Sequence, residues 1–244
     1  MTTVRVTIDW ASPILMPQVG PLVPDTWLLW AQALRTRSGW SMPQDPDWDP
    51  ALPLPLAIDP VSGLWAVSAL TFPDPGVVTA NTGYRNAPNS GDLTNQVHLF
   101  SAKDGSSGPY HAAIYDLTGW STPRSIFWAE LAEDPAAWSI LKGLLTILRY
   151  SGVGRKHADG YGAIRAVQMD ADPGRSAVWD QGRPRRPIPV HAVKTALEAP
   201  RFVFQTAGPR WHGRAILCYG PPVETWTPRL YQKPPRASST VAPT

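Results

Sequence analysis

The chain has 244 residues, of which 43% are hydrophobic, and this composition is typical of a folded globular protein rather than a disordered one. A single cysteine excludes an intramolecular disulfide and any metal site built from several cysteines. No stretch approaches the roughly 18 apolar residues of a membrane span, and the N-terminus MTTVRVTIDW lacks the apolar core of a signal peptide, so we expect a cytoplasmic protein that does not contact membranes.

Charge is distributed unevenly along the chain. Residues 1–141 contain six Lys or Arg against thirteen Asp or Glu, whereas residues 142–236 contain sixteen against six. A basic half joined to a mildly acidic half favours a polyanionic partner, and nucleic acid is the leading candidate. The alternatives are an acidic domain packed on a basic one, or an acidic neighbouring subunit.

The first predicted element is a strand. Apolar and polar residues alternate over residues 4–10, which indicates a half-buried strand, and Pro13 ends it because proline cannot join a central ladder. Asp25 is the expected N-cap of a helix with apolar residues at helical spacing over 27–34. The proline-rich, acidic residues 38–60 are expected to form a long ordered loop.

Two further strands are expected before the second helix. Residues 64–70 (LWAVSAL) predict the second strand, and residues 112–117 (AAIYDL) are the candidate for the third. Between them, residues 73–110 are dominated by turn-forming sequences such as PDPG and KDGSSGP. We interpret 73–110 as an insertion or a long hairpin.

The second helix is predicted to begin at Asp134-Pro135, where an N-cap oxygen precedes a proline suited to the first helical position. Residues 163–169 (AIRAVQM) then predict a fourth strand. The order strand, helix, strand, strand, helix, strand over residues 1–170 is the βαββαβ order of an α+β, ferredoxin-like (RRM-like) core, in which an antiparallel sheet carries two helices on one face.

A smaller, basic and strand-rich C-terminal region is expected over residues 171–232. It contains the basic sequence GRPRRPIPV (182–190), a short helix candidate at 190–197 and two predicted strands, RFVFQT and RAILCYG. Residues 233–244 are a low-complexity tail that we expect to be flexible.

The sequence GVGRKHADGYG (152–162) places four glycines, two cations and a histidine directly after the second predicted helix. It matches neither a P-loop nor a dinucleotide fingerprint, because both lead from a strand into a helix, whereas this loop leads from a helix into a strand. Glycines here permit positive φ and close approach of another backbone. The adjacent cations are suited to phosphate contacts, and a glycine turn with solvated cations is the alternative.

A helix followed by GxGR/K, a short spacer, GYG and a strand resembles the glycine-rich loop of the CRISPR-associated RAMP superfamily. VRVTIDWASPIL (4–15) resembles the first strand and Ser-Pro exit of these proteins, PDTWLLWAQAL (24–34) resembles the first helix of type IV members, and GRPRRPIPV resembles a basic segment that follows the core. Within the superfamily the chain is most similar to the Cas-five-like (Csf-three) subunit of type IV CRISPR effector complexes.

The resemblance implies a non-catalytic RNA-binding subunit of a ribonucleoprotein used in antiviral defence. Such a subunit caps the 5′ handle of the guide (CRISPR) RNA, contacts the backbone subunits and lies near the target nucleic acid at the 5′ end of the guide. It implies no metal and no cofactor. The residues expected to contact RNA are Gly152, Gly154, Arg155, Lys156, His157, Gly160, Tyr161, Gly162, Arg149, Arg165, Arg183, Arg185 and Arg186.

Two other functions stay open. One is a metal-independent RAMP-family endoribonuclease that processes precursor guide RNA, for which Tyr110, His111, Lys156 and His157 supply groups able to transfer protons and stabilise charge. The other is an unrelated small-molecule enzyme or carbohydrate-binding protein, suggested by the alternating acidic residues of 45–49 and by the tryptophans. The 45–49 sequence lacks the glycine and distal glutamate of an EF-hand loop.

Overall fold

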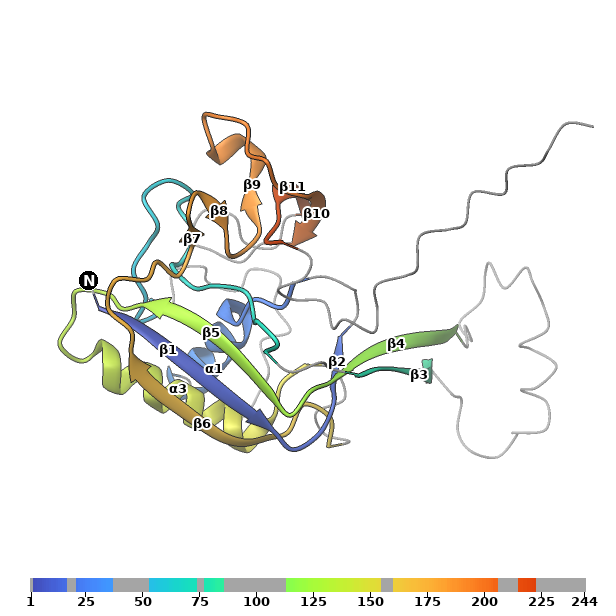
Figure 1. Cartoon of the computed structure of the whole chain (residues 1–244). Coiled ribbons are helices and arrows are strands. Elements are labelled where there is room, and N and C mark those ends of the chain that lie inside the picture. The colour runs from blue at the N-terminus through green and yellow to red at the C-terminus, as the bar shows by residue number, and fades with distance from the viewer. Residues whose placement is uncertain are drawn as a thin grey trace, which may run out of the picture.

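The computed structural model describes residues 2–16, 21–36, 53–73, 77–85, 113–154, 160–205 and 215–222. These residues form an α+β protein built on an antiparallel three-stranded sheet in the order β5-β1-β6 (Figure 1). Strand β1 (Thr3–Trp10) pairs with β5 (Arg124–Glu130) on one side and with β6 (Ile164–Ala171) on the other. The first and fourth predicted strands are thereby confirmed.

The alternation predicted for β1 separates the two faces of this sheet. Val4, Val6 and Ile8 are at most 2% exposed and belong to the main hydrophobic core. Arg5 and Asp9 lie on the opposite face, where each forms an ion pair with a neighbouring strand. Burial of alternate apolar side chains therefore sets the register of β1, because a slip by one residue would place charges in the core.

Residues 66–71 lie along the outer edge of β5. Antiparallel bridges join Val67 to Ala129 and Thr71 to Ile126. The backbones of Thr71 and Ile126 exchange two hydrogen bonds, of 2.7 and 2.8 Å. The second predicted strand, at 64–70, thus falls on an irregular fourth strand beside β5.

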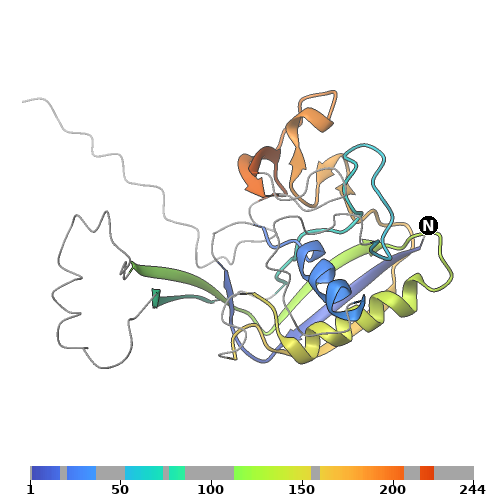
Figure 2. The same cartoon turned by 180° about the vertical axis from the view of Figure 1, so that it is seen from behind.

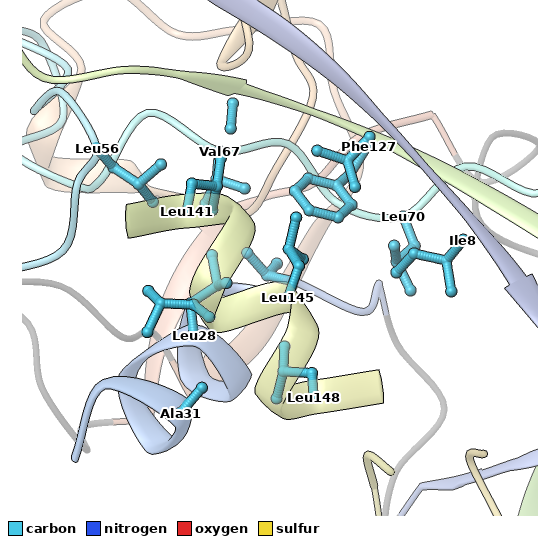
Figure 3. Packing of buried hydrophobic residues seen from close by; sticks show 14 of the residues in the cluster. Ile8, Leu28, Ala31, Leu56, Val67, Leu70, Phe127, Leu141, Leu145 and Leu148 are labelled. Carbon is cyan, nitrogen blue, oxygen red and sulfur yellow. The ribbon is translucent and has the colours of Figure 1, made fainter. Parts of the chain in front are cut away.

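Helices α1 (Asp25–Thr36) and α3 (Ala137–Ser151) lie on the same face of the sheet (Figure 2). Their apolar side chains belong to the same core cluster as those of the strands, and Figure 3 shows Leu145 beneath Phe127. α3 begins two residues later than predicted, and the Asp134 carboxylate accepts a hydrogen bond from the Ala136 N–H (2.8 Å) in the preceding turn.

The third predicted strand is present, but it does not belong to the central sheet. Residues 112–117 overlap strand β4 (Ala113–Ser121), which pairs with β3 (Val77–Arg85) and with β2 (Ile14–Met16) in a separate sheet. The third strand of the central sheet is instead β5, which begins directly after Pro123. The sequence pattern does not predict β5, because apolar Ile126, Phe127 and Trp128 follow one another without alternation.

Strands β3 and β4 form a long antiparallel ladder that runs from the pair Val77–Ser121 to the pair Arg85–Ala113. In Figure 1 this ladder extends away from the central sheet. Its first strand lies inside the segment 73–110, and β2, just after the end of β1, attaches the ladder to the core through β4.

The C-terminal region is built from short strands. β7 (Trp179–Asp180) pairs with β8 (Arg183–Pro184), and β9 (Ile188–Pro189), β10 (Arg201–Gln205) and β11 (Ala215–Tyr219) form a sheet in the order β10-β11-β9. The two strands predicted here are confirmed as β10 and β11. The helix expected at 190–197 is wrong, because only Val190–Ala192 form a short 3-10 turn, η2.

Cys218 of β11 is expected to be inert in the native protein. Its side chain is fully buried, and burial raises the pKa of the thiol to about 12, an effect that the nearby Arg186 opposes only in part. Since the thiolate is the reactive form, we expect no reaction with a thiol reagent in native buffer and one reactive thiol per chain after denaturation in guanidinium chloride. Rapid native labelling would show that β11 opens readily.

Candidate nucleic-acid interface

The loop after α3 has the backbone conformation that its glycines make possible. Gly152, Gly154, Gly160 and Gly162 have φ values of 73°, 83°, 88° and 64°, all in the left-handed region. Residues with a side chain rarely adopt these angles, so the glycine pattern reflects a backbone requirement. The crown residues Arg155, Lys156 and His157 lie outside the described residues, as do Tyr110 and His111.

The base of this loop is fastened to the exit of β1. The Val153 N–H donates to the Gly162 carbonyl (3.0 Å), and the Gly162 N–H donates to the Pro13 carbonyl (2.7 Å). The Ala163 N–H donates to Ser12 Oγ (2.9 Å). The Ser-Pro exit and the glycine loop, which are about 150 residues apart in the sequence, therefore form one structural unit.

Gly162 is the position where this unit leaves no room for a side chain. A Cβ placed there would lie 1.8 Å from the Val153 carbonyl oxygen and 2.9 Å from its carbonyl carbon. Val153 itself is 3% exposed and belongs to the main core. The close approach thus holds the two arms of the loop together at a point anchored in the interior.

Exposed cations stand beside both arms of the loop. Arg149 lies in the last turn of α3, and Arg165 follows the loop at the start of β6. No ion pair between described residues involves Arg149, Arg165 or Lys142. Their charges are therefore not neutralised by a neighbouring carboxylate in the described part of the chain.

A groove of about 290 Å³ lies between α3 and β6 on the approach to the loop. It is lined by Trp138, Lys142, Leu145, Thr146, Arg149, Val167 and Met169. Lys142 was not among the predicted site residues, although it stands seven residues before Arg149 and so lies on the same side of the helix. The groove combines an apolar floor with two cations, which suits a chain that carries both bases and phosphates.

Arg186 is not a surface residue, and its assignment as an RNA contact is wrong. Its side chain is 0% exposed, and Nη2 donates to the Asp25 carboxylate at 2.6 Å. Nη1 donates to the Trp65 carbonyl, also at 2.6 Å. The guanidinium is buried in the interior, where its hydrogen bonds link the C-terminal region to α1 and to the strand beside β5.

Arg183 is exposed and Arg185 is partly buried in the C-terminal region, and the structure brings neither of them to the glycine loop. Arg185 lies over the ring of Trp128, which pairs with Arg5 near the start of β1. The loop instead leads into Ile164, which pairs with Trp10 at the end of β1. At about 3.3 Å per residue, these positions are about 17 Å apart along the strand.

The remaining predicted residue, Tyr161, is half-buried within the loop. In the described part of the chain, no group of three or more His, Cys, Asp or Glu side chains is placed to hold a metal ion. No helix among the described residues has the length and apolarity needed to cross a membrane.

A scan of the chain against protein-family models found no match, and a search of curated proteins found none.

Proposed function

We propose that this chain is a non-catalytic RNA-binding subunit of a type IV CRISPR ribonucleoprotein, built on a ferredoxin-like core. In this role it caps the 5′ handle of the guide RNA and contacts the backbone subunit. The observation that carries the proposal is the glycine loop itself. The N–H groups of Gly162 and Ala163 bind it to the Ser-Pro exit of β1. It is flanked by Arg149 and Arg165, two exposed cations that form no ion pair with the described residues.

The strand order supports the proposed core. β1, α1, residues 66–71, β5, α3 and β6 follow one another in the βαββαβ order, and β1 lies between β5 and β6. With residues 66–71 outside β5, each helix connects two strands that have a third strand between them. That arrangement is the split βαβ unit repeated twice.

The helix-free face of the sheet is poorly suited to be the main RNA platform. Two of the arginines on this face are neutralised, Arg5 by Asp170 (3.2 Å) and Arg124 by Asp9 (3.0 Å). Hydrogen bonds from Gln168 and from Arg5 hold the pKa of Asp170 below its ordinary value, so this carboxylate stays ionised and repels phosphate. Among the described residues, the cations beside α3 and the glycine loop form no ion pair, and they therefore favour that side for the RNA backbone.

Removing two cations beside the loop is expected to weaken RNA binding. In the variant Arg149→Ala/Arg165→Ala, affinity for a labelled single-stranded RNA should fall about tenfold or more, because a charge-assisted hydrogen bond contributes about 1.5–3 kcal/mol. The slope of log affinity against log salt should become shallower by about 1.4, or about 0.7 for each lost phosphate contact. Fluorescence anisotropy over a salt series measures both.

The matched control is Arg35→Ala/Lys194→Ala, which removes two exposed cations elsewhere on the surface. It lowers the net charge by the same amount, so a difference in RNA affinity between the two double variants must come from a site-specific contact. Equal affinities and salt slopes in both would contradict the assignment of the loop.

The role within a complex is tested by isolating the tagged chain from its native cell and identifying what is bound. Small RNAs with a shared 5′ sequence, together with several copies of a second protein, are expected by RNA sequencing and native mass. Recovery of the chain alone, free of nucleic acid, contradicts the proposal. Metal-free incubation with repeat RNA tests the nuclease alternative. Site-specific cleavage that is lost in His157→Ala or His111→Ala would show that the chain is an endoribonuclease and not a non-catalytic subunit.

A further inference from the structure

A second hollow, of about 340 Å³, lies between the helix-free face of the sheet and the C-terminal region. Its walls include Thr71 and Trp128 from the sheet, Asp180, Arg183 and Arg185 from the β7–β8 segment, and Pro222. It lies at the other end of β1 from the glycine loop, so it is a separate place on the molecule. Its volume falls in the range of small-molecule sites, about 300–1,000 Å³.

One wall of the hollow is formed by the guanidinium of Arg185 stacked on the indole of Trp128, and hydrogen bonds orient both groups. The guanidinium carbon of Arg185 lies 4.6 Å from the centroid of the Trp128 ring. Trp128 Nε1–H donates to the Asp172 carboxylate (2.8 Å), and Arg185 Nη2 donates to the Asp180 carboxylate (2.8 Å). These bonds fix the indole and the guanidinium before any ligand arrives, which lowers the ordering cost of binding.

One donor of the stack has no partner among the described residues. The side chain of Arg185 is 14% exposed, and its buried Nε–H has no hydrogen-bond acceptor among the described residues. An unsatisfied buried donor on a charged group is unfavourable unless a ligand or water supplies the acceptor. Arg183 is exposed on the same wall, and no ion pair within the described ranges involves it.

The chemistry of this wall selects a planar, anionic ligand. A planar guanidinium is a stacking surface for a nucleobase, and a neighbouring unpaired arginine suits a phosphate. A sugar would require an open aromatic ring, but Arg185 and Arg175 both lie over the ring of Trp128. A purely apolar ligand would leave the arginines desolvated without a partner.

We propose that this hollow binds one nucleotide of single-stranded RNA, with its base stacked on Arg185 and its phosphate held by Arg183. The inference rests on the proposed RNA-binding function and adds a base contact about 17 Å along β1 from the backbone contacts at the glycine loop. A strand held at both sites would run along β1 from the glycine loop to the hollow.

Two variants separate the stacking contact from the phosphate contact. Arg185→Lys keeps the charge but removes the planar stacking surface, so RNA affinity should fall about fivefold or more with the salt slope unchanged. Arg183→Ala should lower affinity and make the salt slope shallower by about 0.7. Thermal unfolding followed by circular dichroism checks that each variant is folded.

Matched controls are available for both changes. Arg175→Lys alters an arginine that lies 5.2 Å from the centroid of the same Trp128 ring but does not line the hollow, so it should leave affinity unchanged. Lys194→Ala removes an exposed cation from the same C-terminal region without touching the hollow. Photo-crosslinking of an oligouridine that carries 5-iodouridine, with mass mapping, should place a crosslink on the peptide around Trp128 or Arg185.

A second measurement keeps this inference distinct from the proposed function. Titration with uridine or adenosine monophosphate should shift the Nε1–H resonance of Trp128, which is assigned through Trp128→Phe. RNA binding that is unchanged in Arg185→Lys and Arg183→Ala, with no shift from either nucleotide, overturns the hollow and leaves the glycine loop standing. If a nucleotide shifts the Trp128 resonance but the protein binds no RNA, the hollow is a nucleotide site and the proposed function is overturned. If no nucleotide shifts the resonance and no RNA is bound, both proposals are overturned.

Discussion

Replacing Arg186 with methionine is expected to lower the free energy of unfolding by about 3–5 kcal/mol, the usual cost of removing one partner of a buried ion pair. Arg186 and Asp25 are 0% and 2% exposed, so water cannot take the place of the lost guanidinium. The carbonyl of Trp65 would lose its donor as well. Urea unfolding followed by circular dichroism measures the loss.

The exposed pair Arg5–Asp170 supplies the control. Its side chains are 46% and 35% exposed, and Arg5→Met should therefore cost no more than about 1 kcal/mol. In the double variant Asp25→Leu/Arg186→Met no unpaired charge remains in the interior, so most of the lost stability should return. If Arg186→Met is as stable as Arg5→Met, the ion pair does not hold the C-terminal region to α1.

The loss in Arg186→Met should also depend on pH. Burial raises the pKa of the Asp25 carboxyl even in the native pair, and Arg186 acts in the opposite direction. Without the arginine the pKa rises further, so the folded variant binds a proton that the unfolded chain releases. A raised folded pKa gives stability that is lost as the pH rises, and the deficit should therefore shrink as the pH is lowered toward the ordinary pKa of an aspartate, about 4.

Gly162→Ala is expected to lower the free energy of unfolding by about 2–5 kcal/mol, which combines left-handed backbone strain with overpacking. Gly162 has φ of 64°, and an added Cβ would lie 1.8 Å from the Val153 carbonyl oxygen. Because that atom belongs to the backbone, the clash is relieved only by moving the loop away from the core. The same movement should weaken RNA binding, which anisotropy can measure beside the unfolding curve.

Gly174→Ala isolates the part of this effect that comes from backbone strain. Gly174 has φ of 90°, but an added Cβ there meets no atom within 4 Å. Its substitution should cost about 1–2 kcal/mol and leave RNA binding intact. Equal losses in the two variants would mean that the close approach at Gly162 does not hold the loop together.

Both predictions concern how distant parts of the chain are joined. Arg186 connects the C-terminal region to α1, and Gly162 connects the loop after α3 to the exit of β1. In the proposed function Arg186 makes no contact with RNA. They set the positions of Arg149, Arg165 and the β7–β8 segment, which are proposed to make such contacts.

Local patterns were enough to predict several elements. The alternation in β1, the apolar stripe of α3 and the β-branched and aromatic residues of β10 and β11 each describe a surface that one element presents to the core. The glycine pattern of 152–162 likewise predicted positive φ, since φ preference belongs to a single residue. These signals act over a few residues, and the sequence alone therefore determined them.

Only the tertiary structure decided which segment forms the third strand of the central sheet and which arginines reach the surface. β5 is chosen over β4 by its pairing with β1, and Arg186 is buried because Asp25, 161 residues away, supplies the opposite charge. The same long-range packing sets Arg185 on Trp128, far from the loop, and places β6 beside Lys142 and Arg149, so that a groove forms there. Pairing and burial are properties of two segments at once, and the local pattern of one segment does not specify its partner.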